Sequence, residues 1–160
     1  MAYPKSLTPE QALQKARHYC GYQERCHQEV KEKLYGFGLH KTQVEQLLSQ
    51  LIEEDYLNEE RFARQFAGGK FRMKNWGRNR IQNELKQRQV SDYCIRKAMK
   101  EIPDDDYQAT LDKIASVKWE SLADSAKLVR VKKTQDYLLY KGYEWENIQA
   151  VIKKLQGRPD

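Results

Sequence analysis

Residues 77–102 read GRNRIQNELKQRQVSDYCIRKAMKEI, and the apolar positions of this segment recur before and after it. In the segment itself they are Ile81, Leu85, Val90, Ile95, Met99 and Ile102. The same pattern 51 residues earlier gives Val30, Leu34, Leu39, Val44, Leu48 and Leu51. The pattern 53 residues later gives Thr134, Leu138, Tyr143, Ile148, Ile152 and Leu155, with Thr134 as its polar exception. Recurrence at a nearly fixed period predicts a repeat architecture.

The spacing within each copy is helical. The first two positions are four residues apart, and the last three are spaced by four and three, so each copy reads as helix, turn, helix. A further amphipathic helix precedes each pair. We therefore expect three three-helix repeats, over residues 8–54, 58–102 and 104–155. No segment alternates with a period of two, which indicates an all-α fold.

Composition favours an elongated array over a compact globule. The mean hydropathy is -0.94 and 32% of the residues are charged, which suits a small core with much surface. We expect a curved array of either hand. Thr8, Asn58 and Ser91 are predicted helix caps, Gly68-Gly69 is expected to interrupt and bend a helix, and residues 119–124 are predicted to be a loop or short turn.

The positive charge is concentrated in the middle of the chain. The net charge is +6, but residues 1–60 carry net -3, residues 61–100 net +10 and residues 101–160 net -1. A block this one-sided repels itself, which indicates an anionic partner, nucleic acid above all. A solvated helical face and an acidic protein surface are the alternatives.

Two groups of cations are therefore candidate contacts to DNA or to a DNA-bound filament. The first group is Lys70, Arg72, Lys74, Arg78, Arg80, Lys86, Arg88, Arg96, Lys97 and Lys100. The second is Lys127, Arg130, Lys132 and Lys133. Equivalent helices of a curved array can face one side, so the two groups are expected to line one groove and bind phosphates without reading sequence. Glu84 lies four residues from both Arg80 and Arg88, so intrahelical ion pairs compete for those two.

Two aromatic residues, Phe71 and Trp76, lie among these cations. Their rings are candidates for stacking on unpaired bases. The alternative is that they anchor the core or an interface, which is the commoner role for such rings.

Other chemistry is poorly supported by the sequence. His18, Cys20, Cys26 and His27 lack the paired spacing of a zinc site, and Gly68-Gly69-Lys70 lacks most of a phosphate loop. We expect no metal, no cofactor and no catalysis. Without a long apolar run or a disulfide framework, we expect no membrane span and a cytoplasmic monomer.

Several motifs together resemble the RecX family of bacterial regulators of the RecA recombinase. They are Tyr56-Leu57-Asn58-Glu59-Glu60-Arg61-Phe62-Ala63, Gly77-x-x-Arg80-Ile81-x-x-Glu84-Leu85, Tyr137-Leu138-Leu139 with Lys141-Gly142-Tyr143, and Arg25 with Glu29 and Leu34. Their order and spacing are more specific than any one motif. Cys26 departs from the family's common serine cap, Gln89 from a frequent glycine, and Gly68-Gly69 is unusual.

The resemblance implies three tandem three-helix repeats in an elongated, curved body. It also implies binding in the groove of the RecA–DNA filament, with inhibition of filament extension, ATP hydrolysis, strand exchange and coprotease activity. Roles in DNA repair and the SOS response would follow. A free-standing helical DNA-binding protein that acts without RecA is the alternative.

Overall fold

The computed structural model describes residues 6–158, which form nine α-helices and, within that range, no strand. The helices are α1 (Pro9–Tyr22), α2 (His27–Gly36), α3 (Lys41–Glu53), α4 (Glu59–Lys74), α5 (Arg78–Gln87), α6 (Asp92–Met99), α7 (Asp104–Ser121), α8 (Lys127–Lys141) and α9 (Trp145–Gln156). The all-α repeat fold that the sequence predicted is therefore present.

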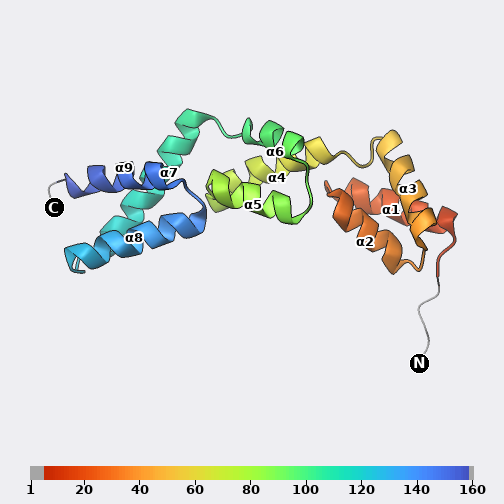
Figure 1. Ribbon diagram of the computed structural model, residues 1–160, viewed down its shortest axis with the longest axis horizontal. Helices are drawn as coiled ribbons and strands as arrows, with labels where there is room; N and C mark the ends of the chain where they lie inside the picture. Colours follow the sequence, from red (N-terminus) through yellow and green to blue (C-terminus); the bar gives the residue numbers. More distant parts are fainter. Residues whose placement is uncertain (1–5, 159–160) are drawn as a thin grey trace, which may run out of the picture.

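The helices form three consecutive groups of three, arranged in a row (Figure 1). We call α1–α3 the first group, α4–α6 the second and α7–α9 the third. The second helix of each group lies along the lower edge in Figure 1, so α2, α5 and α8 follow one side of a shallow arch. The molecule is thus elongated and curved.

The recurring apolar positions are the core positions of the three groups. All eighteen are buried except Leu48 and Met99, which are half-buried. Thr134 is fully buried although polar, because its hydroxyl donates a hydrogen bond to the carbonyl oxygen of Arg130 at 2.8 Å. A buried hydroxyl satisfied in this way costs little, which explains how one copy tolerates the exception.

The predicted caps are confirmed. The Thr8 hydroxyl accepts from the N–H of Gln11, and the Gln11 side chain accepts from the N–H of Thr8, which closes a capping box. Asn58 and Ser91 likewise accept through their side chains at the starts of α4 and α6. In α2 the cap is Cys26, which is buried, and burial raises the pKa of its thiol to about 11.

Two local predictions were wrong. Gly68-Gly69 does not break a helix, since α4 is continuous from Glu59 to Lys74. A Cβ at Gly68 would lie 2.8 Å from the guanidinium of Arg72, whose exposed side chain can move aside. Trp119 is not in a loop either, because α7 continues to Ser121 and buries the indole.

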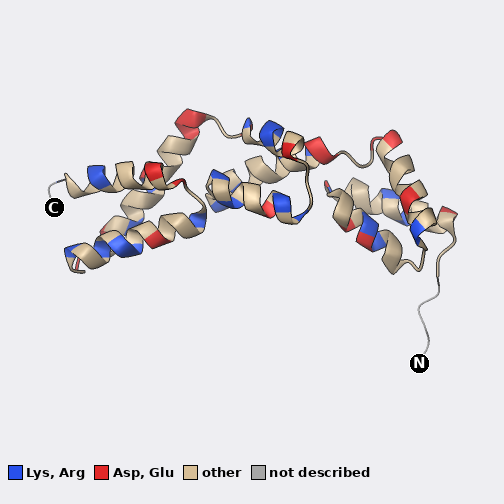
Figure 2. Cartoon of the chain, viewed as in Figure 1, with Lys and Arg blue, Asp and Glu red and all other residues tan. Residues whose placement is uncertain are grey.

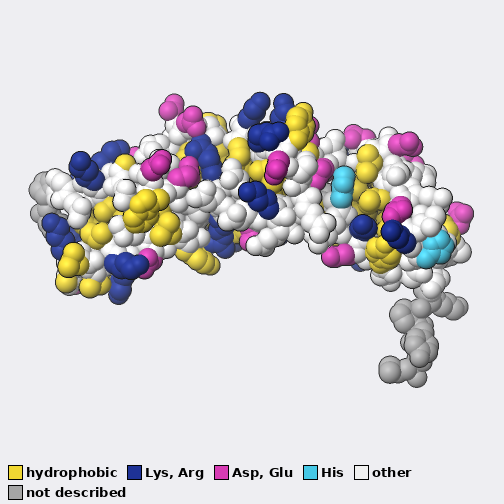
Figure 3. Space-filling model, viewed as in Figure 1, with side chains coloured by type: hydrophobic (Ala, Val, Ile, Leu, Met, Phe, Trp, Pro, Cys, Tyr) yellow, Lys and Arg dark blue, Asp and Glu magenta, His cyan; other side chains and the backbone are white. Residues whose placement is uncertain are grey.

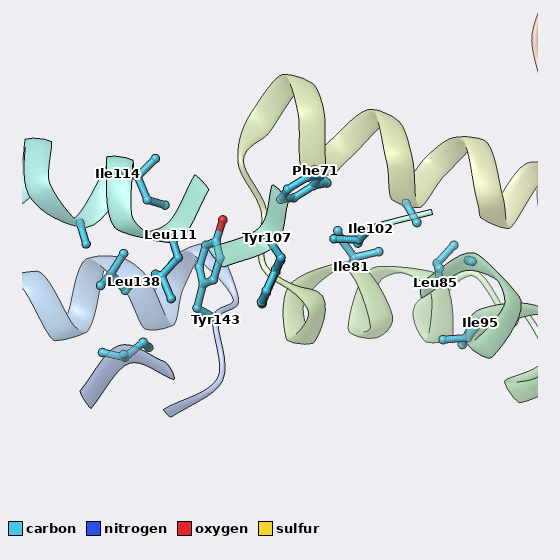
Figure 4. Close-up of a cluster of buried hydrophobic side chains, with 14 of the residues drawn as sticks. Phe71, Ile81, Leu85, Ile95, Ile102, Tyr107, Leu111, Ile114, Leu138 and Tyr143 are labelled. Atoms are coloured by element: carbon cyan, nitrogen blue, oxygen red, sulfur yellow. The ribbon is translucent and has the colours of Figure 1, made fainter. Parts of the chain in front are cut away.

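The buried side chains form two clusters. One belongs to the first group and includes Leu34 and Leu51. The other runs through the second and third groups without a break and also includes Cys26, the N-cap residue of α2 in the first group. Figure 4 shows Phe71, Tyr107 and Tyr143 at the point where the second and third groups meet, with apolar side chains of each group on either side. Tyr107 and Tyr143 stack with ring centroids 5.0 Å apart.

The second and third groups also touch backbone to backbone. The N–H of Gly77 donates to the carbonyl of Lys141 at 2.7 Å, and the N–H of Asn79 donates to that of Gly142 at 2.9 Å. A Cβ on Gly77 would lie 2.4 Å from the Gly142 carbonyl, which is closer than any real contact. Gly142 itself has φ +103° and ends α8 in a left-handed conformation. Both glycines are therefore required by this junction.

Candidate nucleic-acid interface

Cations and aromatic rings alternate along one surface of the second group and continue onto the third. The side chains are Tyr140, Arg80, Trp76, Lys70, Phe66 and Arg88, which we call the cation–aromatic row. They come from α4, the α4–α5 turn, α5, the residue that follows α5, and α8. Tyr140 is 69% exposed, and the other five are half-buried.

Arg80 is the central cation of the row. Its guanidinium carbon lies 4.1 Å from the centre of the Trp76 ring and 4.6 Å from that of Tyr140. It also donates to the carbonyl oxygen of Tyr140 at 3.3 Å. One guanidinium thus joins a ring of the second group to a ring of the third, and the contact holds both rings at the surface.

The row continues from Trp76 along α4. The ammonium of Lys70 lies 5.0 Å from the Trp76 ring centre and 5.5 Å from that of Phe66. Arg88 follows Phe66 in the row, with its guanidinium carbon 4.8 Å from the centre of the Phe66 ring. Its guanidinium also forms an ion pair with Glu84 at 2.8 Å. The sequence had left that pairing open for both Arg80 and Arg88; the structure forms it at Arg88.

Backbone contacts fix the position of Trp76. Asn75 ends α4 in the left-handed conformation, and the Trp76 N–H donates to the Lys70 carbonyl at 3.3 Å. From the third group, the hydroxyl of Tyr143 donates to the Asn75 carbonyl at 2.9 Å. The ammonium of Lys141 reaches the Lys74 carbonyl at 3.1 Å. The turn that carries Trp76 is therefore held from both groups.

The far end of the row opens into a cleft of about 540 Å³ between the first and second groups. Phe66, Lys70 and Arg88 line it from the second group, and Glu24 and Glu29 line it from the first. Arg61 of α4 bridges this boundary by an ion pair with Glu24 at 2.5 Å.

Three residues that the sequence placed at the interface are committed elsewhere. Arg78 lies at the junction, where its guanidinium covers the Tyr107 ring at 3.9 Å and pairs with Asp104 at 2.7 Å and Glu144 at 3.5 Å. Phe71 is 5% exposed and packs on Tyr107, so it cannot stack on a base unless the core opens. Arg130 is 8% exposed and donates to the Trp119 carbonyl at 2.8 Å. Phe71 therefore anchors the core, which was the alternative that the sequence left open. Arg130 packs within the third group and is not part of the exposed surface.

The remaining predicted cations are mostly on the surface. Those with exposed side chains are Arg72, Lys74, Lys86, Arg96, Lys100, Lys127, Lys132 and Lys133, whereas Lys97 is half-buried. Lys132 pairs with Asp136 at 2.8 Å, so the carboxylate partly offsets the positive charge that Lys132 would present to a partner.

The basic side chains do not share one face. Figure 2 shows the Lys and Arg positions of the α6 ribbon on the upper edge of the second group and those of the α5 and α8 ribbons along the lower edge. In space-filling view the α6 cations likewise stand apart from those of the third group (Figure 3). The basic block is therefore divided between α6 on one edge of the second group and α5 on the other, which differs from the single groove that the sequence predicted.

Phe66 and Tyr140 are two members of the cation–aromatic row that were not predicted from the sequence. Phe66 and Tyr140 were read only as parts of helices, since a single aromatic at a helical position carries no signal of its own. Arg80 and Tyr140 meet across 60 residues of chain, and only tertiary structure brings such a pair together.

Among residues 6–158, no three His, Cys, Asp or Glu side chains gather closely enough to hold a metal ion. Within the same range no helix combines the length and the apolar character that a membrane crossing requires.

The fold and its surface define a class: an all-α array of three-helix repeats that presents alternating cations and rings. Comparison with known families is more specific. Residues 58–99 match the second three-helix domain of RecX, and residues 104–152 match the third. The two matches together cover more than half of the chain, which therefore belongs to the RecX family.

Individual relatives agree with this assignment. The chain is 29% identical over 129 residues to the regulatory protein RecX of Clostridium tetani, covering 79% of this chain and 59% of the relative. It is 29% identical over 157 residues to that of Lactobacillus gasseri, covering 98% of this chain and 58% of the relative. The chain thus spans about three-fifths of the length of these relatives.

Solved structures show the same fold. The crystal structure of RecX from Lactobacillus salivarius superposes with a TM-score of 0.83 at 20% identity, covering 92% of this chain and 96% of that one. A second crystal structure, of a regulatory protein RecX, gives 0.82 at 18% identity, with coverage of 91% and 71%.

Proposed function

We propose that this chain regulates the RecA recombinase by binding in the groove of the RecA–DNA filament. Binding there would inhibit filament extension, ATP hydrolysis, strand exchange and coprotease activity, and so act in DNA repair and the SOS response. Membership of the RecX family supports the choice of recombinase. The cation–aromatic row is the observation that supports contact with the filament's DNA.

The chemistry of the row suits an extended polyanion with accessible bases. A single strand offers phosphates at regular intervals and flat bases between them, and proteins bind such strands by combining a basic surface with stacking rings. Tyr140 presents an exposed ring, and Arg80 and Lys70 supply positive charge beside it. Contacts of this kind depend on salt and ignore base sequence.

The elongated shape supports simultaneous contact with protein and DNA. The row occupies one surface of the second group and the edge of the third, which leaves the first group and the α6 edge for the recombinase. In this proposal the chain acts by occupying the filament as a cytoplasmic monomer. It requires neither a cofactor nor catalysis of its own.

The direct test is DNA-dependent ATP hydrolysis by RecA on single-stranded DNA, with and without this chain. We expect inhibition at near-stoichiometric ratios. Tyr140→Ala and Arg80→Gln should each raise the concentration needed for half-inhibition by about fivefold or more, because a lost stacking contact costs roughly 1–3 kcal/mol. Trp145→Ala is the control, since Trp145 is an aromatic residue that is 44% exposed on α9, outside the row and outside the surfaces left for the recombinase.

Two outcomes would reject the proposal. The first is unchanged ATP hydrolysis at stoichiometric ratios; DNA binding by the chain alone would then point to a helical DNA-binding protein that acts without RecA. The second is equal inhibition by the wild type, Tyr140→Ala and Arg80→Gln, which would remove the row from the interface.

A further inference from the structure

The first helix group carries a second cleft, separate from the cation–aromatic row. Its volume is about 560 Å³, and it lies between α1 and α2. Six of its lining residues are aromatic or permanently charged: Lys15, Tyr19, Tyr22, Arg25, Lys33 and Phe37. No carboxylate is among the residues that line it. Its surroundings are therefore positive, although residues 1–60 carry a net charge of -3.

Cations and rings are already paired inside this cleft. The guanidinium of Arg25 covers the Tyr19 ring at 3.7 Å and is held by a hydrogen bond of 3.2 Å to the Tyr19 carbonyl. The ammonium of Lys33 lies 5.2 Å from the Tyr19 ring centre and 5.8 Å from that of Phe37. Arg25 is largely buried and also pairs with Glu29 at 3.6 Å, so it positions the ring, while Lys33 is exposed and available to a ligand.

Tyr22 gives the cleft an open stacking surface. It ends α1 and is 78% exposed. A lone exposed tyrosine has little meaning, but this one borders a cleft that also holds Tyr19, Lys15 and Lys33. The combination places a free aromatic face within reach of two exposed ammonium groups.

We propose that this cleft is a binding site for single-stranded nucleic acid, with a base stacked on Tyr22 and the adjoining phosphates on Lys15 and Lys33. The cleft combines flat aromatic rings with two lysines, Lys15 and Lys33, that have no carboxylate partner among the residues that the structure describes. This combination matches a ligand in which bases and phosphates alternate. A duplex hides its bases and would use only the lysines. An acidic peptide would satisfy the charge and leave the rings without a flat partner. The site adds a DNA contact to the proposed function, but the binding itself requires no recombinase.

The test uses the full chain and no RecA. A fluorescent oligothymidylate and an abasic strand of equal length are titrated by anisotropy at several salt concentrations. Tyr22→Ala should weaken oligothymidylate binding about fivefold or more and leave the abasic strand unaffected, since only a base can stack. Lys33→Gln should weaken both strands and lower the salt slope by roughly 0.7.

Matched controls come from the same group. Tyr35→Ala and Lys31→Gln remove an exposed ring and an exposed charge from α2 at positions that do not line the cleft. Both should bind like the wild type. A second readout is photocrosslinking to a strand that carries 5-iododeoxyuridine, which should label the peptide containing Tyr19 and Tyr22.

Several results would overturn the proposal. One is absence of strand binding by the full chain at low salt. Another is crosslinking confined to other peptides. A third is an equal effect of Tyr22→Ala on both strands, which would indicate a peptide site or a structural role for the ring. None of these outcomes depends on inhibition of RecA, so the site and the proposed function can fail separately.

Discussion

Gly77 and Gly142 let two helix groups meet where any side chain would separate them. A Cβ on Gly77 would lie 2.4 Å from the Gly142 carbonyl oxygen and 2.5 Å from the Tyr143 nitrogen. Because these are backbone atoms, the junction must shift as a whole. Gly77→Ala should therefore lower the free energy of unfolding by about 1–3 kcal/mol, the usual cost of overpacking, as measured by urea denaturation.

The matched control is Gly69→Ala. A Cβ at Gly69 meets no atom within 4 Å, and the residue lies inside the continuous helix α4. Alanine is the better helix former by roughly 0.5–1 kcal/mol, so this variant should be more stable than the wild type. If both alanine variants behave alike, the close approach at Gly77 does not control stability.

Tyr107 makes the junction sensitive to high pH. Its hydroxyl donates to a Glu144 carboxylate oxygen and accepts the Arg78 N–H at 3.0 Å. Burial, followed by the hydrogen bond to Glu144, raises the pKa of Tyr107 above its ordinary value of 10.0. The folded state thus holds this proton more tightly, so its contribution to stability is complete below pH 10 and is lost as the pH rises beyond it.

The free energy of unfolding should therefore fall between pH 9 and pH 11. Tyr107→Phe should reduce that fall by about 1 kcal/mol relative to the wild type. Part of the fall should persist, because burial also raises the pKa of Tyr143. Tyr93→Phe, at an exposed position, serves as the control; if Tyr107→Phe matches this control in its pH dependence, Tyr107 is not the titrating group.

At the scale of the helix, α8 lacks the side-chain cap that is present at the start of α1, α3, α4 and α6. Its N-cap residue is Ala126, which cannot accept a hydrogen bond through its side chain, and its φ and ψ of -58° and 146° are compatible with serine. Ala126→Ser should stabilise the protein by about 1 kcal/mol, measured by thermal or urea unfolding. Ala150→Ser, at an exposed position inside α9, should instead destabilise it slightly; the reverse order would contradict the cap argument.

Helices were the feature that the sequence predicted best. Apolar spacing and caps such as Thr8 and Ser91 act within one or two turns, so they are readable from a short window. The predictions at Gly68-Gly69 and Trp119 were wrong because tertiary packing, which a short window does not show, decides the structure there. Gly68 is a buried residue within the continuous helix α4 rather than a bend, and Trp119 stays helical because the third group's core and Arg130 cover it.

At the scale of the whole molecule, the two core clusters imply two cooperative units. The first group has its own cluster, whereas the second and third groups share one, to which the first group contributes Cys26. Leu34→Ala should therefore speed amide hydrogen exchange in α1–α3 and leave α7–α9 protected. Leu111→Ala should speed exchange in α4–α9 together, since each substitution costs roughly 2–5 kcal/mol in its own unit. Equal loss of protection along the entire chain after Leu34→Ala would contradict this division.

The candidate site could be predicted only in part. Charge counting correctly located the basic region, and Trp76 and Arg80 were named from the sequence. The long-range contacts of the charged side chains were not predicted. Arg78 pairs with Asp104 and Glu144, and Arg80 contacts the ring of Tyr140 from another helix group. Pairing partners 26 to 66 residues away follow from the tertiary fold and leave no local pattern.

The most direct test of the account is electron cryomicroscopy of a RecA filament on single-stranded DNA mixed with this chain. We predict decoration along the filament groove, with Trp76, Arg80 and Tyr140 facing the DNA. Bare filaments at saturating concentrations of the chain, or decoration with these three side chains turned toward solvent, would contradict it.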